Sequence, residues 1–215
     1  MSARRAGEVV EAFGDGHLIR ARRGFRPCRW AFDVARFAPA RAGDRVLDLG
    51  CGVGVLLCAL RQLHPDLGAC VGVEIDSAEV GRAARNLDGR VVRGDVRALP
   101  VAPRAFDLVL ANPPFYPAGW GRSSRGREGA THALAGDVGD FAKAAEQALS
   151  PHGRVVFVYD AGHLTTLLLA FAGAGLTVRR LRFLDDDRRR PARVLALAGR
   201  DGGGLAVERL VFKGG

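Results

Sequence analysis

The sequence predicts an α/β fold, in which a doubly wound, mostly parallel sheet has an antiparallel edge and follows a short N-terminal appendage. Short apolar runs alternate with amphipathic stretches through the middle of the 215 residues, the pattern of βα units whose strands are covered on both faces. Three further β-type runs close the chain with no helical stretch between them, which indicates antiparallel pairing at one edge. The length is sufficient for one sizeable core.

Two strands and two helices open the predicted sheet. Residues 44–49 (DRVLDL) form the first strand, and a glycine-rich turn leads into a helix over 53–63. Residues 69–75 (ACVGVEI) form the second strand. The next helix, over 77–87, has Ser77 as its expected N-cap, because a serine hydroxyl accepts a hydrogen bond from a free amide of the first turn.

The third and fourth strands are expected over 90–93 and 106–111 (FDLVLA). The fourth ends at the Asn-Pro-Pro segment of 112–114, since proline does not continue a strand ladder. A loop rich in Gly, Ser and Arg follows over 115–136. Apolar residues then recur at helical spacing, which predicts a helix over 137–149.

The C-terminal part is expected to hold one more strand and helix, followed by three closing strands. These elements are a strand over 154–159, a helix over 162–173 and strands over 176–184, 193–197 and 206–212. Residues 1–43 are predicted to be an N-terminal appendage or lid to the main domain of 44–215, with a helical stretch over 30–38 suited to capping a site.

The chain has a net charge of +9, and almost all of its positive charge is arginine, since Lys143 and Lys213 are the only lysines. Residues 1–45 hold ten arginines against five acidic residues, and residues 179–193 hold seven against three. Clustered positive charge favours the binding of polyanions. We therefore predict an RNA or DNA partner, with a merely arginine-rich composition as the alternative.

Other classes of protein are disfavoured by features that the sequence lacks. No eighteen apolar residues follow one another, so no membrane span is expected, and the N-terminus lacks the apolar segment of a signal peptide. The four cysteines have no Cys-x-x-Cys spacing and the five histidines lie far apart, so neither a disulfide framework nor a metal site is expected. A cytoplasmic protein without a metal is predicted.

The first chemical motif is the segment 48–54 (DLGCGVG), at the turn from the first strand into the first helix. Ligands of open α/β sheets bind at the carboxyl ends of the strands, where glycines let the backbone approach a ligand closely. The dinucleotide pattern GxGxxG would need glycine at position 55, which is Val55. An acid followed by GxGxG suits a zwitterionic amino-acid tail better, and a tight turn without a ligand is the alternative.

Acidic residues follow the next two strands. Glu74 ends the second strand in VGVEID, where a carboxylate can accept both hydrogen bonds of a ribose diol, with Asp76 as a rival for this role. Asp95 in RGDV follows the third strand and is placed to accept a hydrogen bond from an adenine amino group. For Glu74, a solvated acid at a strand end is the alternative.

The most specific motif is Asn112-Pro113-Pro114-Phe115, after the fourth strand. The two prolines stiffen the loop and fix the directions of the Asn112 side chain and the Pro113 carbonyl. Two fixed acceptors can hold a planar amino group so that its lone pair points at an electrophile, while Phe115 offers a face on which a flat base stacks. A turn that only ends the strand is the alternative.

On these motifs the chain resembles the class I S-adenosylmethionine-dependent methyltransferases that methylate amino groups and carry an NPP[YF] motif. DLGCGVG, VGVEID, RGDV and ANPPF support the resemblance over residues 44–160. Within that group, NPPFYPAG, REGATHALAGDVGDF and PARVLALAGRDGGG are most similar to the bacterial tRNA (adenine-N6) methyltransferases that act on valine tRNA. The resemblance implies a seven-stranded Rossmann-like methyltransferase sheet, S-adenosyl-L-methionine as cofactor and an RNA substrate, namely tRNA.

The resemblance also implies roles for particular residues. The cofactor would be bound by Asp48, Gly50, Cys51, Gly52, Gly54, Glu74, Ile75, Asp95, Val96 and Asn112. The catalytic residues, which orient the amino group and stack on the base, would be Asn112, Pro113, Pro114 and Phe115. Phosphates of the RNA would meet basic side chains in the next loop, namely Arg122, Arg125 and Arg127, for which a solvated loop is the alternative.

The implied reaction is a direct in-line transfer of a methyl group from a sulfonium to an amino nitrogen, which needs no nucleophilic side chain. Three alternatives stay open: N5-glutamine methylation of a protein, guanine-N2 methylation of ribosomal RNA, and a non-catalytic module that binds cofactor or RNA. The positive charge argues against the first, and the intact Asn-Pro-Pro segment argues against the last.

Overall fold

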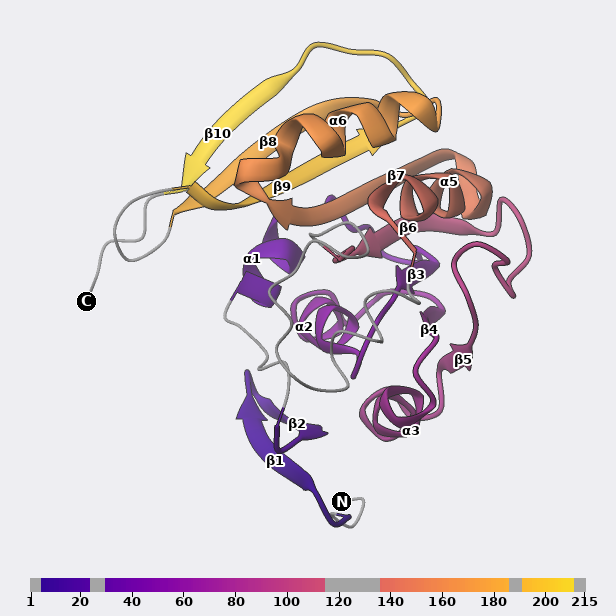
Figure 1. Cartoon of the computed structure of the whole chain (residues 1–215), viewed down its shortest axis with the longest axis vertical. Helices are drawn as coiled ribbons and strands as arrows, with labels where there is room; N and C mark the ends of the chain where they lie inside the picture. Colours follow the sequence, from indigo (N-terminus) through magenta and orange to yellow (C-terminus); the bar gives the residue numbers. More distant parts are fainter. Residues whose placement is uncertain (1–4, 24–29, 115–135, 186–190, 211–215) are drawn as a thin grey trace.

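One large sheet lies between two layers of helices, as the computed structural model of the chain shows (Figure 1). The structure describes residues 5–23, 30–114, 136–185 and 191–210. The strands of the sheet are β3 (Val46–Leu49), β4 (Cys70–Glu74), β5 (Val91–Arg93), β6 (Phe106–Ala111), β7 (Leu149–Asp160), β8 (Thr177–Asp185), β9 (Pro191–Gly199) and β10 (Ala206–Leu210). Their order is β10-β8-β9-β7-β6-β3-β4-β5, and of these strands only β9 runs antiparallel to its neighbours. The predicted mostly parallel α/β sheet is therefore confirmed.

Helices cover both faces of this sheet because its strands are apolar on both sides. One face is covered by α1 (Trp30–Phe37), α2 (Val55–Leu63) and α3 (Ser77–Asn86). The other face is covered by α5 (Val138–Ala148) and α6 (Leu164–Gly173). A short 3₁₀ helix, η1 (Ala161–His163), precedes α6. Successive strand residues alternate between the two cores: Leu108 and Leu110 of β6 pack with α2, whereas Val109 packs with α5. The doubly wound arrangement follows directly from this alternation.

The described sheet has eight strands, one more than the seven that the resemblance implies. The connection from β9 to β10 is short, so β10 returns in the direction opposite to β9. Both sides of β9 are already occupied by β7 and β8, and β10 therefore pairs with β8 in parallel register, Ala206 opposite Arg180. The expectation of antiparallel pairing among the closing strands is right for β8 and β9 and wrong for β10.

The N-terminal residues fold into a hairpin of β1 (Glu8–Phe13) and β2 (Gly16–Ala21), an element that is not among those expected above, although Gly14 and Asp15 between two β-type runs are a hairpin signal. Its turn includes Gly14, whose φ is 56° and on which a Cβ would lie 2.0 Å from the Gln62 side chain. Phe13 and Leu18 of the hairpin are buried in the same core as α1 and α2. The hairpin thus packs directly on the helical layer of the sheet.

Arginines of the basic segment 179–193 hold α1 against the sheet. The Arg180 guanidinium donates to the Phe37 carbonyl and lies 4.2 Å from the centroid of the Phe37 ring. Arg182 lies 5.1 Å from the same centroid and forms an ion pair with Glu208 of β10. These two arginines therefore serve the packing of the protein itself.

Candidate functional site

The carboxyl ends of β3, β4, β5 and β6 meet at one edge of the sheet because these strands are parallel neighbours. Leu49, the last residue of β3, lies opposite Val73 of β4 and Ala111 of β6. The strand ends and the segments after them hold the described residues predicted for the site: Asp48, Gly50, Cys51, Gly52, Gly54, Glu74, Ile75, Asp95, Val96, Asn112, Pro113 and Pro114. Four other predicted residues lie outside the described part of the chain: Phe115, Arg122, Arg125 and Arg127.

The glycine-rich turn after β3 is closely packed at two points and open at a third. Gly50, Gly52 and Gly54 have φ angles of 64°, 55° and 88°, a region that glycine adopts without strain. A Cβ would lie 3.0 Å from the Phe141 ring at Gly50 and 2.8 Å from the Leu87 side chain at Gly54. A Cβ at Gly52 would meet nothing within 4 Å. The turn therefore leaves space for a ligand at the backbone of Gly52.

Asp48 is the buried charge of this edge. Only 1% of its surface is exposed, and neither carboxylate oxygen has a hydrogen-bond partner among the described residues. Burial raises the pKa of Asp48 well above its usual value, and the negative charge of Glu74 adds to this effect. A buried carboxylate without a partner is costly, so an ammonium or hydroxyl group of a ligand would satisfy a need that the protein leaves open.

Glu74 ties the end of β4 to the glycine-rich turn. One of its oxygens accepts a hydrogen bond from the Gly52 amide at 2.8 Å, and the other accepts from the amides of Ile75 and Asp76 at 2.8 and 2.9 Å. A carboxylate has about four acceptor sites, so three amides leave one for a ligand hydroxyl. Glu74 is thus a positioning group for the turn as well as the predicted partner of a ribose diol.

Asp76, rather than Ser77, caps the helix that follows. One of its carboxylate oxygens accepts from the amides of Ala78 at 2.7 Å and Glu79 at 3.2 Å, at the first turn of α3. The prediction of Ser77 as N-cap is therefore wrong by one residue, because the helix begins with Ser77 itself. A carboxylate used in this way serves the helix, which leaves Glu74 as the acid that faces the turn.

Asp95 and Val96 follow β5. Arg97 binds the Asp95 carboxylate through its Nε at 2.9 Å and its Nη2 at 2.6 Å, and the hydrogen bond from Arg97 lowers the pKa of Asp95. Val96 is buried, with 7% of its surface exposed. The motifs of the sequence do not single out Arg97 as the partner of Asp95, although an arginine two residues after an acid can form such an ion pair.

Asn112 is the second unsatisfied group at this edge. Its side-chain oxygen is buried and has no hydrogen-bond partner among the described residues. Pro113 beside it is buried, and Pro114 is half-buried. The side-chain oxygen of Asn112, held beside a stiff proline segment, can therefore accept a hydrogen bond from a ligand, such as one from an amino group.

The three described cysteines are free thiols, and one of them lies in the site. Burial raises the pKa of Cys51 well above its usual value and that of Cys58 to about 12. A thiol that keeps its proton is not a nucleophile. Cys51 contributes instead through its backbone, whose amide donates to the Val73 carbonyl at 3.0 Å.

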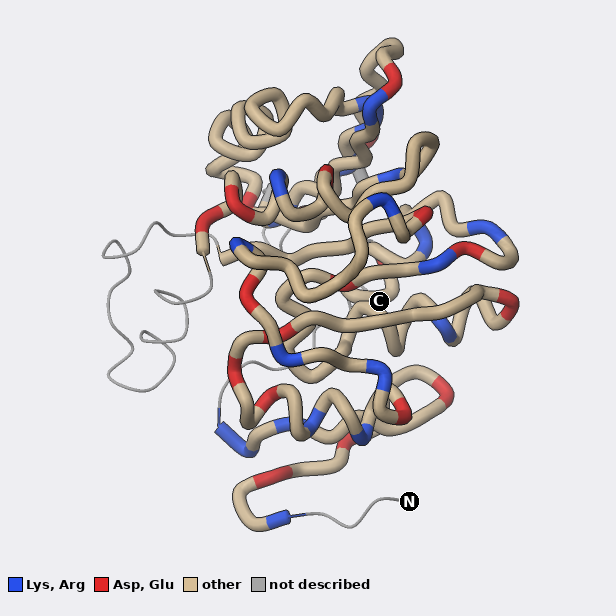
Figure 2. Tube along the Cα trace, turned by 90° about the vertical axis from the view of Figure 1, so that its right-hand side faces the viewer, with Lys and Arg blue, Asp and Glu red and all other residues tan. Residues whose placement is uncertain are grey.

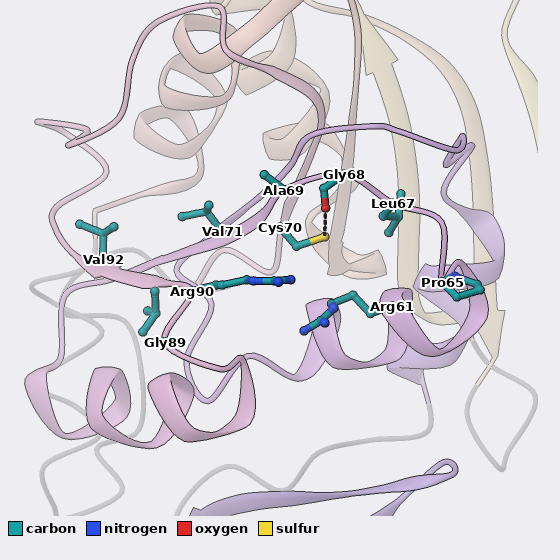
Figure 3. A pocket seen from close by; sticks show the side chains of 11 residues that line it. Arg61, Pro65, Leu67, Gly68, Ala69, Cys70, Val71, Gly89, Arg90 and Val92 are labelled. Atoms are coloured by element: carbon teal, nitrogen blue, oxygen red, sulfur yellow. Dashed lines mark hydrogen bonds between the residues drawn. The ribbon is translucent and has the colours of Figure 1, made fainter.

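A separate hollow of about 580 Å³ opens at the other edge of the sheet, where β4 and β5 begin (Figure 3). Arg61 and Arg90 extend into it, and the Cys70 thiol beside them donates to the Gly68 carbonyl at 3.7 Å. None of the residues predicted for the site lines this hollow. The candidate site is therefore placed by the buried oxygens of Asp48 and Asn112, which have no partner among the described residues, and not by this hollow.

Comparison with known proteins identifies the family of this chain. The methyltransferase small domain family matches residues 34–170, which include the glycine-rich turn, Glu74, Asp95 and the Asn-Pro-Pro segment. The chain belongs to this family. It is a methyltransferase, and the resemblance that its motifs indicated is confirmed.

Relatives of this chain that carry a name are also methyltransferases. The tRNA1(Val) (adenine(37)-N6)-methyltransferase of Tolumonas auensis is 29% identical over 188 residues, which are 84% of this chain and 78% of that protein. The Haemophilus influenzae protein of the same name is 28% identical, over 62% of this chain and 61% of its own. The ribosomal RNA small subunit methyltransferase C of Pseudomonas entomophila is 37% identical over 76 residues, 33% of this chain and 22% of that protein.

Solved structures of methyltransferases share the fold. TrmN from Thermus thermophilus is 26% identical with a TM-score of 0.58, over 78% of this methyltransferase and 47% of that chain. A TehB-like SAM-dependent methyltransferase from Corynebacterium glutamicum has a TM-score of 0.56 at 18% identity, over 81% and 89% of the two chains, and shows the fold alone. The family and its neighbours imply methyl transfer that depends on S-adenosylmethionine.

Two further properties concern only the described residues of this methyltransferase. None of their helices has both the length and the apolar character that a membrane span requires. They contain no group of three or more His, Cys, Asp or Glu side chains placed to hold a metal ion.

Proposed function

We propose that this methyltransferase transfers a methyl group from S-adenosylmethionine to the exocyclic amino group of an RNA base, namely N6 of an adenine in tRNA. One observation carries the proposal: two buried acceptors that have no partner among the described residues, the Asp48 carboxylate and the Asn112 side-chain oxygen, lie at the ends of the neighbouring strands β3 and β6. The Asp48 carboxylate suits a cationic cofactor, and the Asn112 oxygen suits the amino group of a substrate. Such a substrate would place the enzyme in the cytoplasm.

The glycine-rich edge fits S-adenosylmethionine. Asp48 would accept hydrogen bonds from the methionine part of the cofactor, and the open backbone at Gly52 would let the cofactor pass close to the turn. The free acceptor site of Glu74 would bind a ribose hydroxyl, and Ile75, Asp95 and Val96 would border the adenine. When bound, S-adenosylmethionine supplies a methyl group on a positively charged sulfur, an electrophile that needs no activation by a side chain.

The Asn-Pro-Pro segment would orient the acceptor. The Asn112 side-chain oxygen and the Pro113 carbonyl would accept the two hydrogens of the amino group, which aims the nitrogen lone pair at the methyl carbon. Both acceptors also stabilise the positive charge that develops on this nitrogen during transfer. Position and electrostatics therefore suffice for the reaction, and the proton can leave after the methyl group has moved.

The RNA part of the proposal rests on the relatives and on charge. Relatives aligned over most of this chain are named as tRNA methyltransferases, and the net charge of +9 suits a polyanion. Figure 2 shows that basic and acidic positions are interspersed along the described chain. Many arginines of the predicted clusters are paired within the protein, as Arg20 is with Glu11 and Arg193 with Asp160. Phosphate contacts therefore fall to arginines that remain exposed at the functional edge, of which Arg93 is one.

The test is methyl transfer from radiolabelled S-adenosylmethionine to separated tRNA, ribosomal RNA and protein, followed by nucleoside analysis. We expect label in tRNA as N6-methyladenosine, and Asn112→Ala should reduce transfer by about 10²–10³-fold while cofactor binding persists. Label in protein would replace the proposal with glutamine methylation, and N2-methylguanosine in ribosomal RNA would replace it with the activity named for the Pseudomonas relative. Cofactor binding without transfer to any fraction would indicate a binding module.

A further inference from the structure

The side chain of Asn86, the last residue of α3, connects two parts of the molecule that are distant in sequence. Its oxygen accepts a hydrogen bond from the Ile19 amide at 2.9 Å, and its amide nitrogen donates to the Ile19 carbonyl at 2.9 Å. The same nitrogen donates to the Val53 carbonyl, in the glycine-rich turn, at 2.8 Å. Both hydrogens of the amide group and one lone pair of its oxygen are thus engaged.

The hairpin offers this contact because of its register. Ile19 of β2 lies opposite Val10 of β1, and its N–H and C=O both go to Asn86, so they point away from β1. In an antiparallel pair, every second residue directs its backbone groups outward in this way. Asn86 therefore pairs with the outer side of β2 as a residue of a third strand would.

The same end of α3 supports the turn through packing. Leu87, which follows Asn86 and is 1% exposed, occupies the space that a Cβ on Gly54 would need. Val53, whose carbonyl Asn86 holds, is itself 9% exposed. Two successive residues at the end of α3 therefore hold the turn. Asn86 does so by a hydrogen bond to the Val53 carbonyl, and Leu87 by apolar packing against Gly54.

We propose that Asn86 is a positioning residue for the cofactor, which holds the glycine-rich turn through the Val53 carbonyl while it anchors the N-terminal hairpin. The inference rests on the proposed function in one respect, that the turn binds S-adenosylmethionine. It assigns the hairpin a purpose that the sequence alone does not suggest. The cofactor site is built against β2 by way of a single amide side chain.

Gln62 of α2 provides a matched control. Its side chain also makes two hydrogen bonds to the hairpin, accepting from the Asp15 amide at 3.0 Å and donating to the Phe13 carbonyl at 3.1 Å. Neither of these hydrogen bonds reaches the glycine-rich turn. Asn86→Ala and Gln62→Ala therefore remove similar support from the hairpin, but only the first releases Val53.

The experiment is calorimetric titration of the full chain and both variants with S-adenosylmethionine, alongside melting temperature and kcat at saturating cofactor. We expect Asn86→Ala to raise the Kd about five- to tenfold with kcat almost unchanged, and Gln62→Ala to leave the Kd within about twofold. Hydrogen exchange of the amides of residues 50–54, measured without cofactor, should accelerate only in Asn86→Ala. Asn86→Asp keeps the acceptor for Ile19 and loses the donor to Val53, and it should weaken binding at least as much.

Equal Kd values for the wild type and both Asn86 variants would show that Asn86 only stabilises the fold. Equal weakening by Asn86→Ala and Gln62→Ala would assign the effect to the hairpin in general and would also overturn the proposal. If the wild-type protein binds no S-adenosylmethionine, the proposed function fails instead. The exchange of the turn amides then still decides whether Asn86 holds them.

Discussion

The two ends of strand β3 carry buried aspartates in opposite circumstances. Asp44, just before the strand, is 7% exposed and forms an ion pair with Arg154 of β7, which is also 7% exposed. Asp48, at the other end, is 1% exposed and has no hydrogen-bond partner among the described residues. The same residue type, buried at both ends of β3, is thus satisfied at one edge of the sheet and has no partner among the described residues at the other.

The contrast extends along both edges. Next to Asp44, Arg45 binds Asp107 of β6 through two hydrogen bonds of 3.0 and 3.1 Å. Next to Asp48, the oxygen of Asn112 has no partner among the described residues. Buried polar groups that are paired specify and stabilise a fold, whereas buried groups left unpaired need a functional explanation. Among the buried acceptors of the described residues, pairing distinguishes Asp44 at the structural edge from Asp48 and Asn112 at the edge that we propose to be catalytic.

The largest effect is expected where the pair at the structural edge is broken. Among the described residues, Arg154→Leu leaves the buried Asp44 carboxylate with only the Arg41 amide as a partner for its side chain, at 2.8 Å, and should lower the free energy of unfolding by about 3–5 kcal/mol. Urea denaturation measures this loss. The double variant Asp44→Asn/Arg154→Leu, which buries no charge, should recover a large part of it. A loss below about 1 kcal/mol in the single variant would mean that water reaches Asp44.

The matching change at the catalytic edge should act on binding instead of stability. Asp48→Asn removes the buried charge that burial itself disfavours, so the free energy of unfolding should stay equal or rise by about 1 kcal/mol. Affinity for S-adenosylmethionine should fall about 10–100-fold, because a charge-assisted hydrogen bond is lost. Denaturation and titration of one preparation provide both numbers. A lower free energy of unfolding with unchanged affinity for S-adenosylmethionine would show that Asp48, like Asp44, serves the fold and not the cofactor.

The sequence predicts the sheet better than its attachments. Strands β3, β4, β6 and β7 contribute side chains to the cores on both faces and are mostly separated by helices, so their parallel direction follows from the pattern, whereas the pattern does not predict their order in the sheet. The hairpin of β1 and β2 has a local signal in Gly14 and Asp15, but its packing against Gln62, a residue remote in sequence, is visible only in the folded chain. The place of β10 depends on which edge is free, a property of the assembled sheet.

For the site, the sequence predicts which residues meet but not how they are engaged. Parallel strand ends bring Asp48, Glu74 and Asn112 to one edge, and their motifs are sufficient to select them. That Glu74 accepts three amides, and that Asp95 is bound by Arg97, are consequences of local geometry that no motif encodes. Asn86 is missed for the same reason, since its partners lie 33 and 67 residues away.

The two edges should also respond to acid in opposite directions. The pKa of Asp48 is raised in the folded state by burial, so the fold becomes more stable as the pH falls through that raised pKa, down to the unfolded pKa of about 4. Arg45, mainly through a hydrogen bond, lowers the pKa of Asp107 to about 2, and the stability from this pair is present above about pH 4 and lost between about pH 4 and 2. Melting temperature against pH measures both. Asp48→Asn should remove the first change and Asp107→Asn part of the second.

The smallest effect concerns RNA at the two edges. Arg93, the last residue of β5, is exposed at the proposed catalytic edge, whereas Arg90 is exposed just before β5, in the hollow at the other edge. If the RNA backbone follows the catalytic edge, Arg93→Gln should weaken tRNA binding about three- to fivefold and reduce the slope of log K against log salt by about 1. Arg90→Gln, which removes the same charge, should change neither quantity. Arg90 and Arg93 lie at opposite ends of the same strand, so an RNA backbone that follows one edge contacts only one of them. Equal effects of the two variants would therefore mean that net charge alone attracts the RNA.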